Sequence, residues 1–128
     1  MLRIFITRQS RYPLDTKALK HKIEDVLSLR GVKDAEVSIA LVGERKMREL
    51  GQKYLKENKS DPVHEVLSFS ASEDGEFVVP PDKLPLGDVV ICYPEARKIA
   101  IKKNKMMDDV LGELAEHGVM HLLGIHHE

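Results

Sequence analysis

The sequence predicts an α+β fold in which a mixed β-sheet of about four strands packs with helices. Runs of apolar and β-branched residues alternate with segments of helical periodicity. Two of the expected strands, 65–70 and 86–92, follow each other without a helix between them, as in a hairpin, and this favours a mixed sheet. A chain of 128 residues can bury one core, so we expect residues 1–128 to form a single domain.

The first half of the chain predicts two strands and two helices. Leu2–Thr7 and Ala35–Leu41 are rich in β-branched residues and are expected as strands. Asp15 or Thr16 can cap a helix that Gly31 ends. A second helix is expected from Glu44 to about Tyr54. The apolar stripe of the first helix comprises Leu19, Ile23, Val26 and Leu27.

The second half predicts the hairpin and two more helices. Residues 56–62 form a loop by composition, and 65–70 is a short strand expected at an edge of the sheet. Residues 71–85 form a long excursion with one extended piece at 76–79, and Leu86–Cys92 is the best candidate for a buried strand. Helices are expected over Pro94–Lys103 and 107–123.

A basic run begins in the first of these two helices. It comprises Arg97, Lys98, Lys102, Lys103 and Lys105. Such a run is typical of a solvated helix face and is also compatible with a nucleic-acid patch, and the sequence leaves both open. The whole chain has 20 Lys and Arg against 21 Asp and Glu, so RNA binding would need a local patch, and DNA binding is not expected.

The single cysteine, Cys92, excludes a disulfide within the chain and fits a reducing compartment. It follows an apolar run, so a buried thiol is expected rather than a reactive one. No apolar run approaches 18 residues and the N-terminus lacks the core of a signal peptide. We therefore expect a soluble, cytoplasmic protein with no membrane contact.

Four of the six histidines fall in the last dozen residues. His117 and His121 are four residues apart, so on a helix they share a face and can reach one metal ion. Gly124 can end the helix in a left-handed turn and bring His127 to the same ion, while His126 is the neighbouring or exposed group. Three nitrogen ligands with an open fourth position predict one catalytic zinc ion per chain. We also expect these histidines to border the apolar stripe of the helix, in a partly dry site. That stripe comprises Val110, Leu111, Leu114 and Leu122.

The spacing of this triad matches the metzincin pattern H-x-x-x-H-x-x-G-x-x-H. The metzincin general base is a glutamate directly after the first histidine, and Gly118 stands there instead. The ligands therefore match a zinc protease and the base does not, which argues against a peptidase.

Three segments together resemble the YbeY-type endoribonucleases, a family of zinc-dependent rRNA maturation factors. His117–His127 resembles the family signature H-G-x-L-H-L-x-G-Y-D-H, and His64–Phe69 resembles its strand T-D-V-L-S-F. Leu86–Cys92 resembles its strand L-G-D-I-V-I-S, and the order and spacing of the three segments also agree. The resemblance implies zinc held by three histidines and cleavage of single-stranded RNA. It further implies maturation of the 3′ end of small-subunit rRNA and ribosome quality control, with the ribosomal small subunit as partner.

The chain departs from the family pattern at named positions. The family carries a Tyr-Arg pair before the loop, whereas Leu55 follows Tyr54 here and Lys56 is the nearest cation. Lys56 is therefore the candidate for substrate binding, although a lysine lacks the guanidinium fork that contacts phosphate in two places. Beyond the zinc ligands the sequence identifies no catalytic residue. Two other functions stay open, a non-catalytic zinc-containing module that binds the ribosome and a metallohydrolase of another substrate such as a peptide. The role of His64, which precedes the strand in a loop, is undecided.

Overall fold

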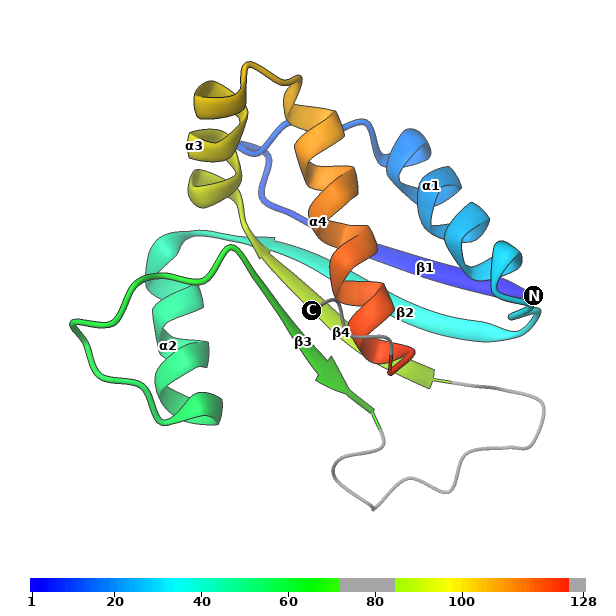
Figure 1. Ribbon diagram of the computed structural model, residues 1–128, viewed down its shortest axis with the longest axis horizontal. Coiled ribbons are helices and arrows are strands. Elements are labelled where there is room, and N and C mark those ends of the chain that lie inside the picture. Colours follow the sequence, from blue (N-terminus) through cyan, green and yellow to red (C-terminus); the bar gives the residue numbers. More distant parts are fainter. Residues whose placement is uncertain (72–84, 125–128) are drawn as a thin grey trace.

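The computed structural model describes residues 1–71 and 85–124 of the chain, and Figure 1 shows their arrangement. The elements in chain order are β1 (Leu2–Thr7), α1 (Thr16–Leu29), β2 (Ala35–Val42), α2 (Glu44–Leu55), β3 (Val66–Ser70), β4 (Pro85–Cys92), α3 (Tyr93–Lys103) and α4 (Met107–Leu122). Each strand and helix expected within these residues is present, with bounds shifted by a residue or so. The extended piece expected at 76–79 lies outside the described residues.

The four strands form one mixed sheet in the order β1-β2-β4-β3 (Figure 1). β1 pairs with β2, and β2 with β4, in parallel, whereas β3 pairs with β4 in the antiparallel direction. This confirms both the hairpin-like relation of the last two strands and the position of β3 at an edge. The α+β class with a mixed four-stranded sheet is therefore confirmed.

Gly87 fixes how β3 lies against β4. It pairs with Ser70 in the antiparallel ladder and has a φ of 137°, which side-chain-bearing residues rarely adopt. A Cβ atom at this position would lie 2.1 Å from the carbonyl oxygen of Phe69. Only glycine allows the two backbones to approach this closely where β3 ends and β4 begins.

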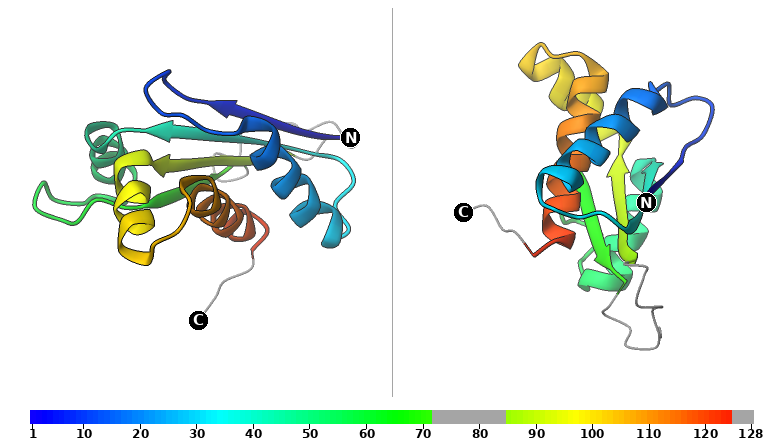
Figure 2. Two further views of the ribbon diagram at one scale, coloured as in Figure 1. Left: turned by 90° about the horizontal axis from the view of Figure 1, so that it is seen from above. Right: turned by 90° about the vertical axis from the view of Figure 1, so that its right-hand side faces the viewer.

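Helices cover both faces of the sheet. Figure 2 shows α1 and α4 on one face and α2 on the other. The alternation of side chains along β4 matches these layers. Val89 and Ile91 belong to the core beneath α1 and α4, whereas Val90 and Cys92 pack with Met47 of α2.

The main core is made of aliphatic side chains from α1, α4 and the central strands. Fully buried members include Ile23, Leu27, Ile39, Ile91 and Leu111. Burial of each such side chain stabilises the fold by about 1.5–3 kcal/mol. The cap expected for α1 is also present, since the Asp15 carboxylate accepts a hydrogen bond from the backbone N–H of Ala18. None of the helices in the described residues has the length and apolarity needed to cross a bilayer.

The buried side of α4 is wider than the expected stripe. Val110 and Leu111 are buried as expected, and Leu114 and Leu122 are partly buried against the core. Gly118, Val119 and Met120 are buried as well, whereas His117 and His121 are exposed. The partly dry metal site stays a prediction. Glycine carries no hydrophobic signal, yet at position 118 it lets the helix turn this side toward the strands.

Candidate metal centre

His117 and His121 lie side by side on the last turns of α4. Their Nε2 atoms are 3.1 Å apart, and their ring centroids are 4.6 Å apart. The helix places them one turn apart on the same face, as the four-residue spacing predicts. The structure therefore brings together two of the three expected ligands.

Gly118 allows this part of α4 to pack closely against the sheet. A Cβ atom at residue 118 would lie 2.5 Å from Val89 Cγ1 on β4 and 3.1 Å from Ser68 Oγ on β3. The Ser68 hydroxyl donates a hydrogen bond of 3.0 Å to the backbone carbonyl of Gly118. A glutamate could not occupy this position without moving the helix. The absence of the protease base thus has a structural cause, because residue 118 faces the strands.

An open groove of about 440 Å³ runs between β3 and the end of α4. Its lining residues are Val66, Leu67, Ser68, Ser70, His117, His121 and Leu122. One wall is therefore the edge strand and the other carries both imidazoles. Sequence reasoning names the histidines and misses the two serines, because alternating polar residues on an edge strand give no signal that separates a groove from ordinary solvent.

The helix ends in the turn that we expect before the predicted third ligand. Gly124 has a φ of 81°, and its N–H donates to the carbonyl of His121 at 3.0 Å. The predicted left-handed glycine is thereby confirmed. His126 and His127 lie beyond it, outside the described residues. In the parts of the chain that are described, no three His, Cys, Asp or Glu side chains gather as a metal site.

The donor geometry of the two described histidines fits a metal ion. Two nitrogens that are each about 2.0–2.1 Å from one tetrahedral zinc ion lie about 3.3–3.4 Å apart. The observed separation of the Nε2 atoms, 3.1 Å, is close to this. Only small rotations of the rings are needed for both nitrogens to bind one ion.

Lys56 and His64 lie away from the groove lining. Lys56 caps the C-terminus of α2 in the left-handed conformation, with φ 55°. The α2 terminus is joined to β3 by a contact between the Tyr54 and Phe69 rings, whose centroids are 5.0 Å apart. Phe69 belongs to the small core beneath α2, whereas Ser68 faces α4. Lys56 is therefore separated from the histidines by the edge strand.

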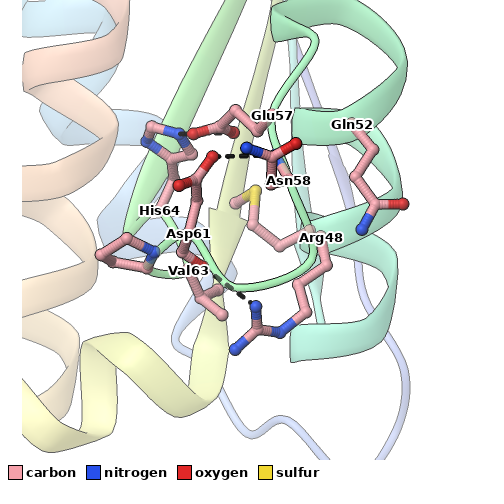
Figure 3. Close-up of a pocket in the computed structure, with 9 residues that line it drawn as sticks. Arg48, Gln52, Glu57, Asn58, Asp61, Val63 and His64 are labelled. Atoms are coloured by element: carbon pink, nitrogen blue, oxygen red, sulfur yellow. Dashed lines mark hydrogen bonds and ion pairs between the residues drawn. The ribbon is translucent and has the colours of Figure 1, made fainter.

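His64 belongs to a network in the loop between α2 and β3 (Figure 3). Its Nε2 atom lies 2.8 Å from both carboxylate oxygens of Glu57. Arg48 donates to the carbonyls of Lys59 and Asp61, each at 3.0 Å, and so ties the same loop to α2. The cavity beside these residues is only about 10 Å³, which is room for a single water. The geometry gives His64 a role in holding the loop.

Cys92 is fully buried, as expected from its apolar surroundings. Burial raises the pKa of its thiol, because a thiolate would lose its hydration. A protonated, enclosed thiol is a poor nucleophile and a poor metal ligand. Cys92 therefore serves packing beneath α2.

Comparison with known proteins gives a consistent result. The family model for endoribonuclease YbeY matches residues 5–128. A relative of that name from Syntrophus aciditrophicus is 35% identical over 94% of this chain and 72% of its own. Others come from Acinetobacter baumannii (37% identical, covering 94% and 75%) and Geobacter metallireducens (34% identical, covering 94% and 77%). The solution structure of TM1509 from Thermotoga maritima matches all of this chain and 75% of its own, at 25% identity and a TM-score of 0.61. The chain belongs to the endoribonuclease YbeY family.

Proposed function

We propose that this chain is a zinc-dependent endoribonuclease that cleaves single-stranded RNA in the maturation of the 3′ end of small-subunit rRNA and in ribosome quality control. Its family membership supports RNA hydrolysis. The main observation in support of the proposed metal site is that the Nε2 atoms of His117 and His121 lie 3.1 Å apart at the wall of a groove. In this proposal residues 1–128 act as one zinc-binding domain in the cytoplasm, with the ribosomal small subunit as partner.

The ligand set is His117, His121 and His127, and each contributes a neutral imidazole nitrogen. The left-handed Gly124 turns the chain after His121, so that His127 can return toward the helix. When bound, a zinc ion supplies a Lewis acid for a phosphoryl oxygen and lowers the pKa of its water ligand. Gly118 and Ser68 keep the two helical ligands at a fixed distance from β3.

The groove is the proposed binding site for the RNA substrate. A volume of about 440 Å³ is in the range of sites for small molecules and admits a nucleotide, but not a double helix. Ser68 and Ser70 give one wall polar character, and Val66 gives it an apolar surface for a base. This shape supports cleavage of single strands. Lys56 lies behind β3, where it can contact the phosphate backbone of an RNA strand that crosses the edge of the sheet.

The two other functions that the sequence leaves open differ in their support. A peptidase is disfavoured because Gly118 faces β4 and has no space for a glutamate. A non-catalytic zinc module on the ribosome has one observation in its favour. Leu55, which stands where the family carries arginine, is half exposed and offers phosphate no hydrogen bond.

One set of assays separates the three functions. Purified protein is offered single-stranded RNA, double-stranded RNA and casein, with and without a chelator, and its zinc content is measured. We expect about one zinc per chain and chelator-sensitive cleavage of single-stranded RNA alone. Zinc without cleavage of any RNA would favour the binding module, and cleavage of casein would favour a peptidase.

A further inference from the structure

A pair of tyrosines lies beyond the carboxyl ends of β1 and β4, away from the histidine groove. Tyr12 and Tyr93 are both buried and stack with ring centroids 4.6 Å apart and an angle of 19° between their planes. The Tyr93 hydroxyl donates to the carbonyl of Pro13 at 2.9 Å. The two rings are thus a rigid joint between the β1–α1 loop and the first turn of α3.

Three exposed arginines surround this joint. The guanidinium carbon of Arg11 is 5.1 Å from the centroid of Tyr12, and that of Arg97 is 5.3 Å from the centroid of Tyr93. The Nη1 atom of Arg8 lies 3.4 Å from the carbonyl oxygen of Tyr12. Because these two guanidiniums lie over fixed rings, they lose less freedom on binding a ligand than ordinary surface arginines do.

The charge of these arginines is not neutralised locally. Over residues 1–71 and 85–124, neither Arg8, Arg11 nor Arg97 makes an ion pair with a carboxylate. The neighbouring acids Glu44 and Glu95 bind Lys98 instead, at 3.5 and 3.0 Å. Other charged residues on α3 are the exposed Lys102 and Lys103. Asp15, two residues after Pro13, and Asp108, which accepts a hydrogen bond from the Asp15 N–H, are further acids near the joint. The basic surface is therefore confined to the three arginines, in a chain whose net charge is −1.

We propose that Arg8, Arg11 and Arg97 form a contact surface for the phosphate backbone of RNA, separate from the cleavage groove. The inference rests on the proposed function in naming RNA as the ligand. Guanidinium groups match phosphate oxygens in a planar, two-pronged geometry, and stacked arginines are pre-oriented for it. Val89 lies beneath the histidine-bearing part of α4, and Tyr93 is four residues further along, about 13 Å at the rise of a β-strand. Both residues are buried, so this length gives only the separation of the two sites along β4, which a few nucleotides of single-stranded RNA can span.

The test measures binding of a single-stranded RNA oligonucleotide by fluorescence anisotropy over a range of salt concentrations, with chelator present so that no cleavage occurs. The variant R11Q/R97Q is compared with the parent chain. We expect its Kd to rise roughly tenfold and its log–log salt slope to fall by about 0.7 for each phosphate that is no longer neutralised. The matched control is R30Q/K33Q, which removes two exposed charges between α1 and β2, at the end of the sheet where β1 and β2 begin, and should bind like the parent.

A second variant separates charge from packing. R11K/R97K keeps both charges and should retain most of the salt slope, with a Kd between those of the parent and R11Q/R97Q. A slope in R11K/R97K as small as in R11Q/R97Q would assign the effect to weaker packing on the tyrosines and overturn the proposal. So would an unchanged Kd in R11Q/R97Q, or displacement of the RNA by polyglutamate at equal charge, which would indicate a site for acidic proteins. Because binding is read without cleavage, an inactive parent chain would refute the proposed function and leave this test intact.

Discussion

Two close side-chain pairs, each containing histidine, lie on either side of the edge strand β3. They differ in the kind of side chain that the histidine contacts. Behind the strand, His64 faces a carboxylate, with Nε2 at 2.8 Å from both oxygens of Glu57. In front of it, His117 faces His121, with their Nε2 atoms 3.1 Å apart. Both pairs are close contacts between side chains, but one joins an imidazole to a carboxylate and the other joins two imidazoles.

A carboxylate accepts the proton that an imidazole N–H donates, so the His64–Glu57 pair is complete by itself. Two neutral imidazole nitrogens that face each other can share one hydrogen, or both can donate their lone pairs to one cation. Proximity between side chains alone therefore does not identify a metal ligand. The identity of the partner gives His64 a role in holding the loop and is compatible with the proposed binding of a metal by His117 and His121.

The largest expected effect comes from removing one imidazole of each pair. His121→Ala should lose most of its zinc, because two remaining ligands hold the ion far more weakly. His64→Ala is the matched control, and it should keep its zinc while its stability falls by about 1 kcal/mol, because the hydrogen bond to Glu57 is removed. Zinc content is measured by atomic absorption and stability by urea unfolding. Full zinc occupancy in His121→Ala would contradict the assignment.

Gly118→Ala tests whether the helix must sit tightly on the strands. The added methyl group would meet Val89, which is packed in the core, so we expect a loss of about 1–3 kcal/mol in the free energy of unfolding. The control is Gly112→Ala on the same helix, whose methyl would meet only the flexible Lys22 side chain. That variant should be neutral or stabilised by up to about 1 kcal/mol, since alanine favours helices. Equal effects at both positions would show that close packing at residue 118 is unimportant.

Gly124→Val tests the turn toward the third ligand. Gly124 has φ 81°, and a Cβ atom there would have open space around it within the described part of the chain. Valine would therefore be strained at this position by its backbone conformation alone. We expect zinc affinity to fall roughly tenfold, which corresponds to about 1.4 kcal/mol. Gly31→Val, at φ 78° and equally open, should lower stability and leave zinc affinity unchanged. Competition with a coloured chelator measures both variants.

Lys56 should give the smallest effect, because it is an exposed cation behind the edge strand. Lys56→Ala should slow RNA cleavage roughly threefold with zinc content unchanged, as for a single solvated charge contact. Lys46→Ala, at the opposite end of α2, should have no effect. Leu55→Arg should raise cleavage if a two-pronged phosphate contact is missing at this position. Unchanged cleavage in Lys56→Ala would remove this lysine from the mechanism.

Local sequence signals predict the helices and strands, and they predict that His117 and His121 lie together. Alternating β-branched runs predict β1 and β2, and the four-residue spacing predicts that His117 and His121 share a face. Gly124 is identifiable as the helix-ending residue because the left-handed backbone conformation favours glycine. Val110 and Leu111 are buried on α4 as predicted, but the burial of Gly118 is missed, because its close packing depends on Val89, which is distant in sequence. The hydrogen bond from Ser68 to Gly118 joins residues fifty positions apart and is beyond reach for the same reason. The contact of His64 with Glu57 spans only seven residues, but no spacing rule identifies such a pair in a loop. His127 stays a prediction.

The close contact at Gly87 has a consequence for how the protein can misfold. In a strand, a shift of pairing by one residue sends every side chain to the opposite face. Such a slip of β3 would turn Phe69 toward the histidines and bury Ser68 and Ser70 beneath α2, so the groove would be filled by a ring. A backbone contact that admits only glycine at residue 87 penalises this slipped hairpin, which would bring a side-chain-bearing residue to the same point. We therefore expect Gly87 to favour the native register of β3 on β4, and its replacement to yield a fraction of compact but inactive molecules.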